Sequence, residues 1–133
     1  MLAHRQAVHT ASAPAPIGPY SQAMVGGGFV FTVGVVGSNP ATSQLVPGGL
    51  AAEARQALEN LDRILDAAGS VMTAIVKCTV YLTDMGDFAA FNEIYSSKVP
   101  KPFPARTTVA VLGLPLGARV EIDCVAVADS GQA

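Results

Sequence analysis

The segment that most constrains the fold is the amphipathic stretch from about Leu50 to Ala68. Its apolar residues recur at helical spacing and form one stripe: Ala54, Ala57, Leu58, Leu61, Ile64, Leu65 and Ala68. Its charged residues are assigned to the other side: Glu53, Arg55, Glu59, Asp62, Arg63 and Asp66. A helix with one apolar stripe has to bury that stripe against another layer. The rest of the chain must therefore supply a sheet or further helices to cover it.

Segments typical of β-strands lie on both sides of this helix. They are Tyr20–Val25, Phe29–Val36, Val71–Thr83, Arg106–Leu112 and Arg119–Ala128, with a short edge strand near Val8. The three glycines 26–28 predict a hairpin turn between the first two, because glycine supplies the positive φ of tight turns. A second helix is expected from Phe88 to about Ser97, with Asp87 as its cap. The last two strands read as a simple hairpin joined by residues 113–118.

The order of these elements predicts an α+β fold. It consists of a mixed sheet of about six strands with two helices packed on one face. At 133 residues the chain fits one domain, residues 1–133. Half of the residues are apolar and only 14% are charged, and the helices leave one sheet face uncovered. We therefore expect further copies of the chain to cover that face in an oligomer.

Composition argues against several classes of function. The net charge is −2 and the basic residues are scattered, whereas nucleic-acid binding needs a concentrated basic face. No apolar run approaches the roughly 20 residues that span a bilayer. The only histidines, His4 and His9, lie in the N-terminal arm, and Cys78 and Cys124 have no ligand-spaced neighbours. We therefore expect no nucleic acid, membrane, metal or cofactor, and two buried reduced thiols in a cytoplasmic protein.

Two charged residues, Arg106 and Glu121, are set within apolar strand sequences. Burying a charge is costly unless it is paired or used, and spacing alone favours a structural ion pair or two solvent-facing residues. A hairpin centred near residues 115 and 116 would place Arg106 opposite residue 125, about 13 Å from Glu121. That separation makes an intrachain pair less natural and favours a shared pocket, closed by another subunit.

Two polar residues add weaker candidates to this pocket. Tyr20 follows Gly18-Pro19, where its phenol could reach a cleft, although an ordinary core or interface tyrosine explains it as well. Asn92 lies among apolar residues of the second helix. Helix interiors slightly disfavour asparagine, so a specific hydrogen bond is one explanation and a solvated side chain is the default.

Several separated segments, taken together, resemble the RidA/YjgF/UK114 family over nearly the whole chain. The strongest matches are Leu114-Pro115, Phe103–Val109, which reads FPARTTV, and Val120–Asp123, which reads VEID. Further matches are Ile17–Ala23, Ala54–Leu61, and Asp87–Ala89 with Asn92 and Tyr95. The resemblance implies a chorismate-mutase-like fold and a homotrimer with sites in the clefts between subunits. It also implies hydrolysis of reactive enamines and imines, such as 2-aminoacrylate, to 2-oxo acids and ammonia.

The resemblance assigns roles to individual residues. Arg106 would bind the substrate carboxylate, Glu121 would activate the attacking water, and Tyr20 would join them as a third catalytic residue. The substrate-binding residues would be Gly34, Val35, Asn92 and Thr108. Thr108 stands where the family commonly has cysteine, which is tolerable if that position acts through its backbone carbonyl.

One segment departs from the family pattern. Where the family usually reads Ser-Gly-Gln, this chain has Val33, Gly34 and Val35. Two polar groups of the expected pocket wall become valines, so we expect a more apolar pocket and a preferred imine larger than the smallest one. A pathway-specific deaminase of a larger, aminomuconate-like enamine and a non-catalytic ligand-binding or regulatory trimer remain alternatives. The ribonuclease activity sometimes ascribed to the family fits poorly, because no basic stripe is present.

Overall fold

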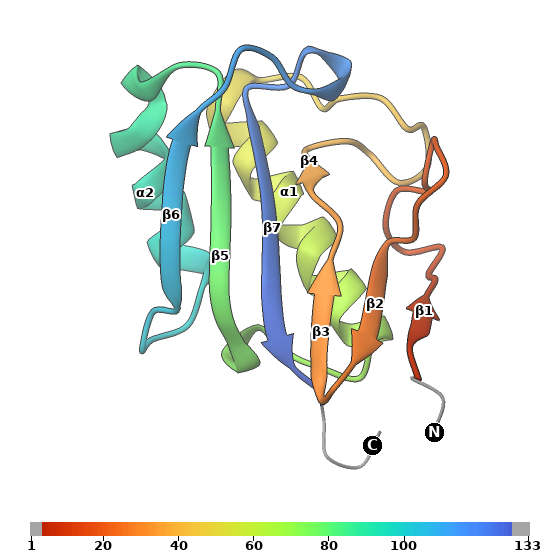
Figure 1. The fold of residues 1–133 in the computed structure, drawn as a ribbon. Coiled ribbons are helices and arrows are strands. Elements are labelled where there is room, and N and C mark those ends of the chain that lie inside the picture. Colours follow the sequence, from red (N-terminus) through yellow and green to blue (C-terminus); the bar gives the residue numbers. More distant parts are fainter. Residues whose placement is uncertain (1–3, 129–133) are drawn as a thin grey trace.

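The computed structural model describes residues 4–128, which form one sheet with two helices on one face (Figure 1). Within these residues the strands are β1 Gln6–Val8, β2 Ala23–Gly26, β3 Phe29–Thr32, β4 Val35–Val36, β5 Ile75–Leu82, β6 Ala105–Ala110 and β7 Val120–Val127. The α-helices are α1 Gly49–Ala67 and α2 Phe88–Lys98, and three short 3-10 helices are η1 Met72–Ala74, η2 Met85–Asp87 and η3 Pro115–Gly117. The α+β prediction with both helices on one face is confirmed.

The strands follow the order β1-β2-β3-β7-β5-β6, with β4 also paired to β7. All pairs are antiparallel except β5 and β6, which are parallel. The predicted hairpin between the last two strands is therefore wrong, because β5 lies between β6 and β7. The polar strand β6 occupies the edge of the sheet, while β7 buries alternate residues and lies inside it.

Three local predictions also need correction. The strand predicted over 29–36 is interrupted after Thr32, so that β3 and β4 are separate. Glu53 belongs to the buried side of α1, with 3% of its surface exposed. The Asp87 side chain does not cap α2; its carboxylate instead forms an ion pair with Arg119, with 2.8 Å between Oδ1 and Nη2. A bidentate guanidinium is the stronger partner for that carboxylate.

The hydrophobic core lies between the helices and the sheet. It contains the apolar stripe of α1 and the helix-facing residues of β5 and β7, among them Val80 and Ile122. Cys78 and Cys124 are register partners on these two strands, and both are buried free thiols, as expected. No helix among the described residues has the length and apolarity needed to span a bilayer.

Among residues 4–128, no helix lies on the other face of the sheet. Every second residue of β7 is buried toward the helices, and the residues between them face the open side. Phe29, Phe31 and Val127 are between 40% and 49% exposed there. Exposed apolar side chains gathered on one face are typical of a surface that binds another chain.

Candidate active site

Arg106 lies on the edge strand β6 and points toward α2. Its guanidinium carbon lies 4.7 Å from the ring centre of Tyr95, 5.5 Å from that of Phe91 and 5.6 Å from that of Phe88. All three rings belong to α2, so the helix forms an aromatic wall around the cation. Such contacts stabilise a guanidinium by cation–π attraction while leaving its N–H groups available.

Two polar side chains fix the orientation of this guanidinium. Nη2 of Arg106 donates to Oδ1 of Asn92 at 2.6 Å, and Nε donates to the Thr108 hydroxyl oxygen at 3.0 Å. The structure therefore brings Arg106, Asn92 and Thr108 together. It gives Thr108 a side-chain contact, where the sequence suggested only its backbone carbonyl. Asn92 is thus hydrogen-bonded rather than solvated.

Glu121 lies on β7 and faces the open side of the sheet. Val36 is its register partner on β4, and Gly34 immediately precedes that strand. A Cβ atom added at Gly34 would lie 2.8 Å from Cδ of Glu121 and closer still to Oε2. Glycine is therefore required at this position because the Glu121 carboxylate lies over its backbone.

Burial raises the pKa of the Glu121 carboxyl, and the neighbouring Asp123 charge raises it further. Asp123 is two residues along the same face of β7, where its Oδ2 accepts a hydrogen bond from the Tyr81 hydroxyl at 2.9 Å. A carboxyl group whose pKa is raised toward neutral pH can both accept and return a proton at physiological pH. Among the described residues Glu121 forms no ion pair that would oppose this shift.

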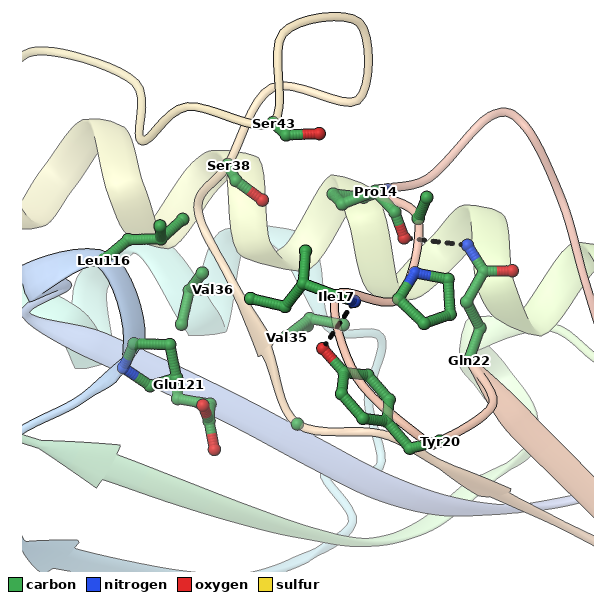
Figure 2. Close-up of a pocket in the computed structure, with 14 residues that line it drawn as sticks. Pro14, Ile17, Tyr20, Gln22, Val35, Val36, Ser38, Ser43, Leu116 and Glu121 are labelled. Carbon is green, nitrogen blue, oxygen red and sulfur yellow. Dashed lines mark hydrogen bonds between the residues drawn. The ribbon is translucent and has the colours of Figure 1, made fainter.

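A pocket of about 100 Å³ opens beside Glu121 (Figure 2). The N-terminal arm lines one side, the segment from Gly34 to Ser38 another, and Pro115 and Leu116 a third. Tyr20 also lines it, and its hydroxyl accepts a hydrogen bond from the Ile17 N–H at 3.2 Å. Within the described part of the chain no lysine or arginine lines this pocket, and most of its wall is apolar.

Within one chain, Arg106 and Glu121 lie on opposite faces of the sheet. Arg106 shares its register with the buried Cys78, whereas Glu121 shares its register with Tyr81 on the open face. Strand β5 separates them, so their backbones are about 10 Å apart across the strands alone. The hairpin argument made an intrachain pair less natural, and the described residues contain no ion pair between these two, although the predicted hairpin itself is wrong.

Comparison with known proteins identifies the family. The family model described as "Endoribonuclease L-PSP" matches residues 10–128. Human 2-iminobutanoate/2-iminopropanoate deaminase is 47% identical over 123 residues, covering 92% of this chain and 90% of the relative. The corresponding enzyme of Capra hircus is 49% identical over the same length and coverage. This chain belongs to the RidA/YjgF family.

Solved structures of RidA/YjgF proteins have the same fold. RidA from the Antarctic bacterium Psychrobacter sp. PAMC 21119 superimposes with a TM-score of 0.89 at 41% identity, covering 92% of this chain and 98% of that one. E. coli TdcF, solved with bound serine, gives a TM-score of 0.87 at 37% identity, covering 93% and 99%. The predicted family and fold are therefore confirmed.

The RidA-like pocket differs in one respect from the sequence-based expectation. Gly34 and Val35 line it, but Val33 does not; Val33 packs against the hydrophobic core. Val33 and Val35 are two residues apart, and Val35 is itself only 6% exposed. The substitution at position 33 therefore alters the core behind the pocket, and the prediction that both valines form its wall is half wrong.

Sequence reasoning missed other residues of the pocket. The arm residues Pro14 to Ile17 and the turn residues Pro115 and Leu116 line it. Gln22, which also lines it, is 2% exposed. Gln22 lies in the family-like segment Ile17–Ala23 and near the start of an apolar strand, but neither signal distinguishes a buried amide from an exposed one.

Proposed function

We propose that this chain is an imine deaminase. It hydrolyses enamine and imine intermediates of the 2-aminoacrylate type to 2-oxo acids and ammonia. The names of its curated relatives support this activity. The observation that carries the proposal is the fixed orientation of the Arg106 guanidinium. A small carboxylate substrate is positioned only by a cation that is itself held in one orientation.

Arg106 is the proposed carboxylate-binding residue. A guanidinium has five N–H groups, and Asn92 and Thr108 engage one on Nη2 and the one on Nε. The three that remain are on Nη1 and Nη2. A two-point contact with the carboxylate therefore uses the Nη1/Nη2 edge, which fixes the position of the adjacent imine carbon.

Glu121 is the proposed general base. An enamine first tautomerises to the imine. The carboxylate of Glu121 then takes a proton from a water molecule while the oxygen of that water bonds to the imine carbon. The protonated carboxyl returns this proton to nitrogen, which gives a carbinolamine. The carboxylate then takes the proton of the new hydroxyl group and passes it to the amino group, so the carbon–nitrogen bond breaks, ammonia leaves and the carbonyl forms. The raised pKa of Glu121 suits both steps. Tyr20, Gly34 and Val35 border the reacting atoms in this proposal.

The complete site is proposed to lie between subunits of a homotrimer. Arg106 and Glu121 face opposite sides of one sheet, so one substrate molecule can meet both only if they come from different chains. The apolar open face, with Phe29, Phe31 and Val127, supplies a surface that association would bury. The buried reduced thiols are consistent with a cytoplasmic location, which we also propose.

Three alternative functions differ from this proposal in what they require of the pocket. The apolar pocket wall favours a substrate larger than 2-aminoacrylate, but an aminomuconate-like enamine would bring a second carboxylate to a wall that has no lysine or arginine among the described residues. A ligand-binding trimer without turnover would keep the Arg106 contacts and lack hydrolysis. The endoribonuclease named by the family model fits poorly, because no basic side chain lines the pocket beside Glu121.

Ammonia release tests the proposal directly. The imine of alanine is generated in situ by an amino acid oxidase, and ammonia release is followed with and without the protein. We expect acceleration by the wild type and its loss in Arg106→Ala and Glu121→Gln. Ligand binding without acceleration would favour the regulatory trimer, and full acceleration by Arg106→Ala would overturn the mechanism.

A further inference from the structure

Three buried polar side chains lie at the pocket: Gln22 lines it, and Glu53 and Asn60 lie behind its walls. Gln22, Glu53 and Asn60 are 2%, 3% and 0% exposed. Burying a polar side chain is unfavourable unless its hydrogen bonds are made, and here each bonds to backbone. In all three cases the backbone segment that bonds to the side chain either forms a wall of the pocket or directly follows one.

Gln22 holds the wall formed by the N-terminal arm. Its Oε1 accepts from the N–H of Thr10 at 2.7 Å, and its Nε2 donates to the carbonyls of Thr10 at 3.1 Å and Pro14 at 2.9 Å. A longer contact of 3.4 Å joins Nε2 to the Ala13 carbonyl. The arm has no regular secondary structure between β1 and β2. The amide of Gln22 therefore takes the place of a sheet ladder in fixing residues 10–14, as Figure 2 shows for Pro14.

Asn60 holds the second wall from the opposite side. Its Nδ2 donates to the carbonyls of Val36 at 3.1 Å and Ser38 at 2.9 Å, and its Oδ1 accepts from Gln56 at 2.8 Å. Both carbonyls belong to residues that line the pocket. This segment continues past the end of the two-residue strand β4, so ladder bonds alone do not define its path.

Glu53 holds the third wall at its C-terminal side. Its Oε1 accepts from the N–H of Arg119 at 2.7 Å, two residues after the turn η3 that carries Pro115 and Leu116. The backbone of Glu53 also packs so closely against Gly37 that a Cβ there would lie 2.6 Å from its Cα. Helix α1 thus positions two walls through Glu53 and Asn60.

We propose that Gln22, Asn60 and Glu53 are positioning residues that set the width of the pocket and thereby its selectivity for the side chain of the 2-imino acid. Each is hydrogen-bonded to the backbone of a wall segment or of the residues next to it, and none contacts the reacting atoms in this proposal. The walls are apolar, so the substrate class this spacing favours is 2-imino acids with a branched aliphatic side chain. The inference takes its ligands from the proposed function but concerns selectivity, not turnover.

Selectivity is measured by binding two product acids, pyruvate and 4-methyl-2-oxopentanoate, to the intact protein by calorimetry. The ratio of their Kd values reports the pocket walls, because the two acids share the 2-oxo carboxylate and differ only in the side chain. We expect the wild type to bind the branched acid more tightly. Gln22→Met, which keeps length and removes the hydrogen bonds, should reduce that preference about fivefold. Asn60→Leu, which keeps the size of the side chain and removes both donors without adding a charge, should do the same and serves if the first variant does not fold.

Ser70→Ala is the matched control. Ser70 is also buried, and its hydroxyl donates to a backbone carbonyl, that of Val127, at 2.8 Å, but it does not line the pocket. Its loss should lower the melting temperature and leave the Kd ratio unchanged. Equal weakening of both acids in Gln22→Met and Asn60→Leu, or an unchanged ratio, would overturn the proposal, as would a wild type that binds neither acid. A ratio that responds while the wild type releases no ammonia would refute the deaminase activity alone.

Discussion

Arg106 and Glu121 project from opposite faces of one sheet, with strand β5 between the strands that carry them. Neither can reach the other within a chain, although both are expected to act on one small substrate. The proposed chemistry therefore predicts that the two residues meet where two chains associate.

Mixed assemblies of two inactive variants test this relationship. Arg106→Ala and Glu121→Gln should each be inactive alone. Unfolded together and refolded as a mixture, they should regain part of the wild-type rate of ammonia release, because some interfaces then contain both intact side chains. Each variant refolded alone is the control, and a mixture as inactive as its components would contradict a shared site.

The contacts that orient Arg106 predict a graded effect at position 108. Thr108→Val removes the acceptor for Nε without changing shape, and kcat/KM should fall about tenfold, mostly through KM. Thr108→Ser keeps the hydroxyl and should retain most of the activity. Steady-state kinetics on the alanine-derived imine decides this; equal losses in both variants would show that the methyl group matters instead.

Asn92 has the shorter contact with Arg106 and should show the same pattern. Asn92→Ala frees Nη2, so the guanidinium can rotate within its aromatic wall. We expect about a tenfold loss in kcat/KM with little change in melting temperature. Kinetics and thermal unfolding of the same preparation separate the two effects, and unchanged kinetics would remove Asn92 from the site.

Gly34→Ala should inactivate the enzyme without unfolding it. The added methyl would collide with the Glu121 carboxylate, which can move only by leaving its position beside the pocket. Gly113→Ala is the matched control, because a Cβ there meets nothing within 4 Å. Ammonia release and circular dichroism of both variants measure this, and an active Gly34→Ala would mean that the Glu121 position is not critical.

Glu121 should also give a pH-dependent stability. Its folded-state pKa is raised, so the fold favours the protonated form: this contribution is complete below the unfolded pKa of about 4.3 and is lost as pH rises through the folded value. Glu121→Gln should therefore melt at a higher temperature than the wild type at pH 7, with the difference vanishing near pH 4. A pH-independent difference would contradict the shift.

The charge of Asp123 predicts the direction of a change in the activity profile. Activity that needs ionised Glu121 falls as pH drops through its pKa. Asp123→Asn removes the second cause of the raised pKa, so the acidic limb of kcat/KM should move to lower pH. The shift should be partial, since burial is the larger cause, and movement to higher pH would refute the assignment.

The local periodicity of apolar residues was sufficient to predict the position of helix α1 and strand β7. Helix α1 was predicted from about Leu50 to Ala68 and runs from Gly49 to Ala67, because its apolar stripe repeats at helical spacing. The alternation around Glu121 likewise predicted β7. Residue patterns also identified Arg106 and Glu121 as charges that needed an explanation, and the family resemblance supplied one.

The tertiary structure decided which strands are neighbours and which face each side chain takes. The sequence pairs Arg106–Leu112 with Arg119–Ala128, yet β5 separates them, because the α2 crossover makes β6 parallel to β5 and leaves β7 to pair on the other side. It also decided that Glu53 is buried and that Asn92 holds Arg106. Sequence periodicity reports which residues share a face of one element. Pairing, burial of single polar groups and the meeting of distant side chains depend on contacts between elements, which exist only once the chain has folded.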